Sequence, residues 1–274
     1  MKYTFIFRKI LAFLLLSILF VDCKKEASPG NKGPVRAQIF LTDHPTPIFD
    51  SVFIDIQKLE VKFEDSTLQN SGWVTLTIQP GVYNILRFRN GLDTLFAGGN
   101  LPSNNIRKLR MTLGNQNSVV KNAISFPLRI NSNDMQVVAN LSDSNFDIAS
   151  PGQLFFWIDF DAGNSIRTDN SGPGNNNGFI LKPHIRIFTK SKSGRIEGRV
   201  LPIAADAIVM AIRGTDTTMA IPDDHDGEYK IVGLNAGTYS LFIDGQNGYI
   251  DTLINNIVVR NGEDAHVPSV TLHQ

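Results

Sequence analysis

The chain has 274 residues, enough for one large or two modest domains once an N-terminal leader is set aside. Lys plus Arg and Asp plus Glu both total 26, so the net charge is zero, which gives no electrostatic case for binding nucleic acid or an acidic membrane surface. Charged residues make up 19% of the chain, and its polarity comes instead from Asn, Ser, Thr and Gly, which is typical of turn-rich β structure outside the cytoplasm.

The N-terminal segment has the pattern of a secretory signal peptide. A basic start over residues 1–9 precedes an apolar run over residues 10–20, which is shorter than the ~20 residues that a membrane-spanning helix needs. The only cysteine of the chain follows, and Val21-Asp22-Cys23 resembles the lipobox of bacterial lipoproteins, with Asp22 where that motif usually has Gly, Ala or Ser. We expect residues 1–22 to be a lipoprotein signal peptide and Cys23 to be acylated; an ordinary signal peptide with an incidental cysteine is the alternative.

Acylation of Cys23 would leave no thiol in the mature chain, so disulfides, zinc–thiolate sites and redox chemistry are not expected, and no cofactor is predicted. Residues 23–34 are polar and contain Gly, Pro and Lys, as in a flexible tether. Lys24 stands where an Asp would signal retention in the inner membrane of enteric bacteria. By that analogy we expect an outer-membrane lipoprotein, held by its N-terminal lipid, on either face of that membrane.

From Val35 onward, most apolar runs alternate with period two and stop at Gly, Asn, Asp or Pro, which predicts short strands packed as a sandwich or barrel. The longest run is Ser51–Phe63, in which the apolar phase slips after Ile56, so a β-bulge is expected near Gln57-Lys58. The other expected strands cover residues 36–42, 73–78, 106–113, 123–130, 136–141, 153–161 and 179–189. A short helix or packed loop is expected within residues 83–97, and a long hairpin loop over residues 162–178.

A polar linker at Ser191–Gly194 separates two sets of strands. The predicted fold is therefore all-β: two β-sandwich domains in tandem behind the signal peptide and tether. The first block is residues 35–190 and the second block is residues 194–273.

The second block carries the motifs Gly194-Arg195-Ile196-Glu197-Gly198-Arg199-Val200, Asp226-Gly227-Glu228-Tyr229-Lys230-Ile231-Val232-Gly233-Leu234 and Ala236-Gly237-Thr238-Tyr239-Ser240-Leu241. With them it resembles the carboxypeptidase regulatory-like domain, a seven-stranded transthyretin-like β-sandwich. The residues agree with that fold. Asp226-Gly227 permits a turn with positive φ, and the alternation places Tyr229 beside Ile231 on one face. The resemblance implies a non-catalytic attachment.

The first block resembles a lipoprotein domain of unknown function, the family numbered 4382. The resemblance rests on segments that include Leu41-Thr42-Asp43-His44-Pro45, Arg107-Lys108-Leu109-Arg110-Met111-Thr112-Leu113, Asp159-Phe160-Asp161-Ala162 and Leu181-Lys182-Pro183-His184-Ile185. His44 stands where the family usually has Ala. The family implies an envelope lipoprotein and assigns no reaction.

Asp159 and Asp161 form the most interesting acidic pair. Alternate residues of a strand share one face about 6.8 Å apart, so Phe155, Trp157, Asp159 and Asp161 are expected to line one face of their strand. Aromatic rings beside carboxylates can bind sugars, and two carboxylates can act as acid and base or hold calcium. The alternative is a buried strand whose acids pair with an Arg or with backbone N–H groups. Lys182, His184 and Arg186 are the candidate partners. We favour this second interpretation, in which the two acids have a structural role.

The run Asp223-Asp224-His225-Asp226-Gly227-Glu228 offers closely spaced oxygen ligands. It lacks the longer ladder of an EF-hand loop, so a solvated turn is favoured over a weak calcium site at Asp223, Asp224 and Asp226. The five histidines have no ligand-type spacing and are interpreted as surface or strand residues.

The sequence shows no G-x-S-x-G, H-E-x-x-H or P-loop motif. We therefore expect a non-catalytic, lipid-anchored envelope protein that binds or presents a partner, either a glycan or another envelope protein. The alternatives are a carbohydrate-binding lipoprotein and a hydrolase that uses Asp159 and Asp161.

Overall fold

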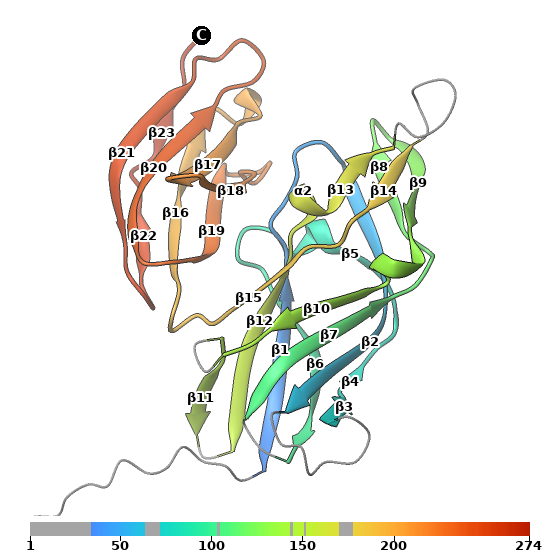
Figure 1. The fold of residues 1–274 in the computed structure, drawn as a ribbon. Coiled ribbons are helices and arrows are strands. Elements are labelled where there is room, and N and C mark those ends of the chain that lie inside the picture. The colour runs from blue at the N-terminus through green and yellow to red at the C-terminus, as the bar shows by residue number, and fades with distance from the viewer. Residues whose placement is uncertain (1–33, 64–71, 103–104, 143–144, 151, 170–177) are drawn as a thin grey trace, which may run out of the picture. The chain divides into compact units, whose positions relative to one another are not determined.

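The computed structural model describes residues 34–63, 72–102, 105–142, 145–150, 152–169 and 178–274 (Figure 1). Residues Gly33–Gln274 form one compact unit. Cys23, the signal peptide and the tether lie outside the described residues. In the part of the chain that is described, no helix is long and apolar enough to cross a membrane.

The first block contains two β-sheets with a common core. The six-stranded sheet has the order β11-β12-β1-β6-β4, with β15 paired to β12. Its strands are β1 (Val35–Thr42), β4 (Thr77–Ile78), β6 (Thr94–Leu101), β11 (Asp147–Ser150), β12 (Gln153–Phe160) and β15 (Ile185–Phe188).

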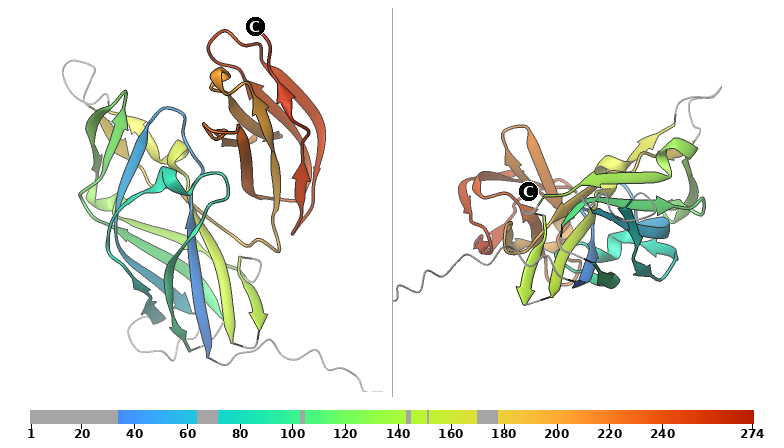
Figure 2. Two further views of the ribbon diagram at one scale, coloured as in Figure 1. Left: turned by 180° about the vertical axis from the view of Figure 1, so that it is seen from behind. Right: turned by 60° about the horizontal axis from the view of Figure 1, so that its bottom comes forward.

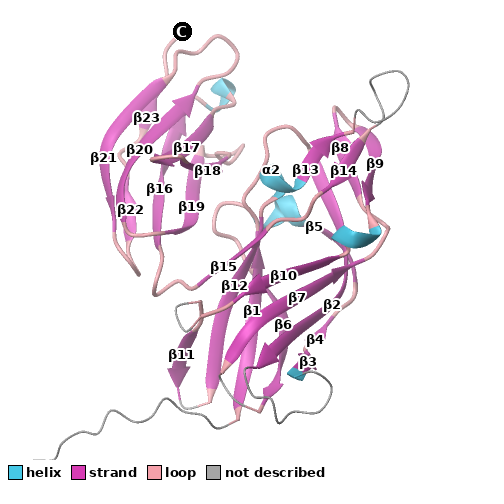
Figure 3. Cartoon of the chain, in the orientation of Figure 1, coloured by secondary structure: helices cyan, strands magenta, loops and turns pink. Residues whose placement is uncertain are grey.

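The nine-stranded sheet has the order β10-β7-β2-β8-β9-β14-β13, with β3 and β5 paired to β2. Its strands are β2 (Ser51–Phe63), β3 (Trp73–Thr75), β5 (Gly81–Asn84), β7 (Ile106–Leu113), β8 (Ser118–Lys121), β9 (Ile124–Ile130), β10 (Gln136–Asn140), β13 (Ile166–Thr168) and β14 (Phe179–Leu181). The described helices of this block are single turns: η3 (Ile85–Phe88), η4 (Ser132–Asp134) and α2 (Ala162–Ser165) (Figure 3).

Strand β12 shows how the alternation of the sequence builds the core. Its residues Leu154, Phe156, Ile158 and Phe160 are all fully buried, and they pack in the same apolar cluster as Ile39 and Leu41 of β1. Each such side chain contributes about 1.5–3 kcal/mol by leaving water. β1 and β12 are neighbours and run parallel, an arrangement that Figures 1 and 2 show from opposite sides. The C-terminal ends of both strands therefore meet at one edge of the sheet.

The second block also contains two sheets, each of four strands. One has the order β19-β16-β22 with β23 paired to β16, and the other has the order β18-β17-β20-β21. The strands are β16 (Gly194–Leu201), β17 (Ile208–Arg213), β18 (Asp216–Ala220), β19 (Glu228–Leu234), β20 (Gly237–Asp244), β21 (Thr252–Val259), β22 (Asp264–His266) and β23 (Val270–Thr271), with the single turn η5 (Ile203–Ala205).

The block thus has eight strands where the resemblance implied seven. β22 and β23 both pair with β16 in parallel, and Pro268, which has no N–H to donate, lies between them. Tyr229, Ile231, Tyr239 and Leu241 are buried in one cluster, as the alternation predicts. Gly227 has a φ of 75°, and a Cβ on it would lie 2.2 Å from the carbonyl oxygen of Val200, so this turn requires glycine.

The prediction of an all-β protein built as β-sandwiches is confirmed. The predicted bulge in β2 is confirmed too, because the pairing of β2 with β7 shifts between Ile56 and Lys58. The two blocks have separate apolar clusters. Their division into domains that fold independently stays a prediction.

Three predicted segments differ from the structure. The expected loop at 162–178 instead contains α2 and β13, with residues 170–177 outside the described part. The expected strand 179–189 is two strands in different sheets, because Pro183 interrupts it. The expected strand 73–78 likewise divides into β3 and β4, which belong to different sheets.

Candidate functional site

The candidate site is a polar cluster at the shared C-terminal end of β1 and β12, buried except at the half-buried Arg186 and the exposed His184. Thr42 of β1 pairs with Asp159 of β12, so the residues that follow each strand leave the sheet at the same edge. β15 pairs antiparallel with β12 and places Arg186 opposite Asp159. The cluster consists of Asp43, His44, Asp159, Asp161, His184 and Arg186. It brings together three of the segments on which the family resemblance of the first block rests.

Asp159 is 1% exposed and forms an ion pair with Arg186. The guanidinium donates to Oδ2 from Nε at 2.9 Å and also from Nη2. Although burial alone would lower the pKa of Arg186, the charge and hydrogen bonds of Asp159 raise it. The second oxygen, Oδ1, accepts no hydrogen bond from any described group. Asp159 therefore has its charge neutralised inside the protein and one acceptor unused.

Asp161 lies just beyond the end of β12 and caps the N-terminus of α2. Its Oδ1 accepts from the backbone N–H of Asn164 at 3.1 Å, and its Oδ2 accepts from Nδ2 of the same residue at 2.7 Å. His44 Nδ1 lies 3.3 Å from Oδ1 and His184 Nδ1 lies 3.4 Å from Oδ2. Burial opposes ionisation, but these contacts outweigh it and hold the pKa of Asp161 well below its usual range.

His44 is 5% exposed, so its interpretation as a surface or strand histidine was wrong. Its Nε2 accepts a hydrogen bond from the backbone N–H of Met219 at 2.7 Å. A nitrogen that accepts carries no proton, so the ring proton of the neutral histidine is on Nδ1, which faces Asp161. The hydrogen bond from Met219 thereby decides which ring nitrogen of His44 is the acceptor.

Asp43 is the least satisfied member of the cluster. It is 4% exposed, and neither carboxyl oxygen has a hydrogen-bond partner among the described residues. Burial, together with the charges of Asp159 and Asp161, raises the pKa of Asp43 well above its usual range. The nearby amide of Ala162 and the guanidinium of Arg89 only partly offset this. A carboxyl group in these surroundings favours its neutral form.

The aromatic residues of the predicted site, Phe155 and Trp157, share a face of β12 with Asp159. Trp157 is half-buried and stacks on Phe40, with ring centres 5.0 Å apart, and on Phe188 at 6.3 Å. Its indole N–H donates to Asp93 at 2.8 Å, and Lys190 lies 4.7 Å from the ring centre. Phe155 is also half-buried, whereas Asp159 and Asp161 are buried. The four predicted residues therefore do not share one exposed concave surface.

The acidic run at the start of β19 is an exposed turn. Asp223 Oδ1 accepts from the backbone N–H of His225, and Asp226 Oδ1 accepts from that of Glu228, each at 2.9 Å. Asp223, Asp224 and Asp226 are exposed. Among the described residues, no group of three or more His, Cys, Asp or Glu side chains is placed to hold a metal ion. The lipidation residue Cys23 lies outside the described part.

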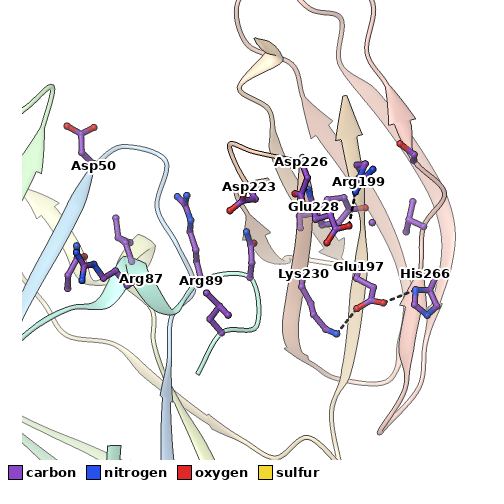
Figure 4. Close-up of a pocket in the computed structure, with 18 of the residues that line it drawn as sticks. Asp50, Arg87, Arg89, Glu197, Arg199, Asp223, Asp226, Glu228, Lys230 and His266 are labelled. Atoms are coloured by element: carbon purple, nitrogen blue, oxygen red, sulfur yellow. Dashed lines mark hydrogen bonds and ion pairs between the residues drawn. The ribbon is translucent and has the colours of Figure 1, made fainter. Parts of the chain in front are cut away.

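A groove of about 930 Å³ also opens in the Gly33–Gln274 unit. On the wall that the second block forms, Glu197 contacts Lys230 at 2.5 Å and His266 at 2.8 Å, and Arg199 contacts Glu228 at 2.9 Å (Figure 4). Arg87 and Arg89, which follow β5, line the groove as well. Its walls are therefore polar and carry both signs of charge.

Comparison with known families matches residues 35–183 to the model described as "Domain of unknown function (DUF4382)". The chain belongs to this family. The DUF4382 match covers the whole buried cluster except His184 and Arg186, which directly follow its last matched residue. No curated protein matches the chain.

The solved structures that resemble this DUF4382 protein do so distantly. They include the Bacillus anthracis TIE protein (12% identity, TM-score 0.25, covering 82% of this chain and 34% of that one). The shaft pilin SpaA of Lactobacillus rhamnosus GG has 10% identity and a TM-score of 0.20 over 88% of this chain and 96% of that one. The major pilin BcpA of Bacillus cereus has 12% identity and a TM-score of 0.22 over 88% and 70%. The chain thus spans about a third of the length of the Bacillus anthracis protein, and these similarities carry no conclusion about function.

Proposed function

We propose that this DUF4382 protein is a non-catalytic binding or presentation module of the cell envelope, held at the outer membrane by a lipid on Cys23. The second block would then be an accessory domain of the carboxypeptidase regulatory-like type. Its two four-stranded sheets, and the turn that requires Gly227, support this part of the proposal.

The observation that carries the proposal is the burial and hydrogen bonding of Asp159 and Asp161. A hydrolase that used them would need carboxyl groups that reach a substrate. Both side chains are at most 3% exposed, and their hydrogen bonds go to Arg186 and Asn164 within the first block. These contacts tie together β12, β15 and α2, which is a structural role.

The groove lined by Arg87, Arg89 and the charged wall of β16 and β19 offers a surface for a polar partner. Some of its charged side chains already pair with one another, so a partner would have fewer side chains to order on binding. This feature supports binding as the role and makes the groove the first place to test.

The carbohydrate-binding alternative needs a flat aromatic ring that a sugar can reach. Trp157 does not offer one, because Phe40, Phe188 and Lys190 already contact its ring. The structure therefore gives this alternative no specific support at Trp157.

The test compares Asp159→Asn and Asp161→Asn with the parent protein in thermal melts and against a panel of glycosidase and esterase substrates. We expect lower melting temperatures and no turnover by any of the three proteins. Asp134→Asn is a matched control, because Asp134 pairs with Lys182 in a more exposed position. A parent turnover that Asp159→Asn or Asp161→Asn abolishes while melting is unchanged would make the protein an enzyme.

A further inference from the structure

We propose that the carboxyl group of Asp43 is a buried proton-binding site: it is neutral in the folded protein at neutral pH, and the stability that its bound proton gives the first block is lost as the pH rises. The proposal concerns a group that the proposed binding function does not use. It rests on the position and unmet hydrogen bonds of Asp43.

A buried charged group needs a partner, and Asp43 makes no well-formed hydrogen bond in the described structure, where the backbone amide of Ala162 is a nearby donor. Its protonated form has one O–H to donate. The unused Oδ1 of Asp159, in the same cluster, is an acceptor that lacks a donor.

The charges around Asp43 come from four elements. β12 provides Asp159, whose charge Arg186 of β15 neutralises. The start of α2 provides Asp161, which His44 and His184 contact. The segment after η3 provides Arg89. Arg186 already pairs with Asp159. Ionised Asp43 would therefore add a third carboxylate charge beside Asp159 and Asp161, and the half-buried Arg89 would be its main counter-charge. Two neighbouring carboxylates in such surroundings do not both ionise readily.

The pH dependence follows from the direction of the pKa shift. The pKa of Asp43 is raised in the folded protein, so the folded state binds its proton more tightly than the unfolded state does. The resulting stability is fully present below the unfolded pKa of about 3.9 and is lost as the pH rises through the folded value. Between the unfolded and the folded pKa of Asp43, only the folded state holds this proton. The unfolding equilibrium constant therefore rises about tenfold for each pH unit in that range. Asp161 changes the pH dependence of stability only at acid pH, because its pKa is lowered.

The experiment measures denaturant unfolding of the parent and of Asp43→Asn over roughly pH 5 to 10, with Asp134→Asn as the exposed control. Asn keeps the shape and the donor of a protonated Asp but cannot ionise. We expect the ratio of the parent's unfolding constant to that of Asp43→Asn to rise with pH, about tenfold per unit while Asp43 stays protonated in the folded state. The ratio of the parent to Asp134→Asn should stay nearly flat. Parallel curves for the parent and Asp43→Asn would overturn the proposal.

A second measurement decides the matter even if Asp43→Asn does not fold. Infrared difference spectra of the folded parent, labelled with ¹³C-aspartate, should contain the carbonyl band of a protonated carboxylic acid at neutral pH. Absence of that band would overturn the proposal. If Asp43→Asn folds, a rise in the parent's melting temperature on adding Ca²⁺ that this variant lacks would also overturn the proposal, because a cation rather than a proton would then occupy the site.

Discussion

Replacing Asp159 by Asn removes the negative charge from the centre of the buried cluster while preserving its shape. Asp159 is 1% exposed, and Arg186 donates to its Oδ2 from both Nε and Nη2. Hydrogen bonds to charged groups are worth about 1.5–3 kcal/mol each. Removing one member of a fully buried ion pair costs about 3–5 kcal/mol. The Arg186 side chain is 31% exposed, so water can partly solvate it once the partner is lost.

We therefore expect Asp159→Asn to lower the free energy of unfolding by about 1.5–3 kcal/mol, which is less than the cost for a fully buried pair. In a block of this size, that loss corresponds to a fall in melting temperature of about 2–4 °C per kcal/mol. Circular dichroism melts and urea titrations of the parent and the variant provide the measurement.

The double-mutant cycle of Asp159→Asn with Arg186→Gln is the control. If the pair is what Asp159 contributes, the two losses should be non-additive by at least about 1 kcal/mol, because both substitutions break one interaction. Additive losses, or an Asp159→Asn variant as stable as the parent, would refute the structural role assigned to this carboxylate.

Three further predictions follow from the structure and the sequence. Asp161→Ala should cost about 0.5–2 kcal/mol through loss of the α2 cap. Because the pKa of Asp161 is lowered in the folded state, this cost should shrink progressively as the pH falls below about 4, and equal losses at pH 7 and pH 3 would contradict this. Cys23→Ala should release the protein from the membrane fraction and abolish fatty-acid labelling, whereas a variant that stays membrane-bound, with a parent that is never labelled, would exclude the anchor. The fragment of residues 194–274 should unfold cooperatively on its own, since it has a separate apolar cluster, and its persistent aggregation would mean that the blocks depend on each other.

The period-two pattern of the sequence predicted the long strands well because burial of one face is a strong, local signal. β2 and β7 occur at the predicted bounds, and the bulge in β2 was visible as a phase slip. The missed strands lack that signal. β6 contains Gly98 and Gly99, which interrupt the apolar alternation. β8 is joined to β9 by Asn122-Ala123, both with positive φ, and Ala at such a position gives no turn signal.

The candidate site was predictable only in part. Strand alternation identified Asp159, and the sequence offered Arg186 as its partner, which is the pairing that the structure contains. Asp161 was expected in the same strand register, but β12 ends at Phe160 and Asp161 caps α2 instead. Asp43 and His44 belong to a family motif, but their sequence pattern did not predict that they join the cluster. Their contact with β12 depends on the parallel pairing of β1 and β12, which are more than 100 residues apart in the sequence, and no local pattern encodes that pairing.

The cluster also helps to set the register of β15 against β12. A slip of β15 by one residue against β12 would turn Arg186 to the opposite face of the sheet and leave Asp159 buried beside Asp43 with no cation. Leaving a buried charge uncompensated costs about 3–5 kcal/mol, a large share of the stability of a typical domain. The acids at the end of β1 and β12 thus have a role that requires these residue types, and catalysis is not needed to account for them.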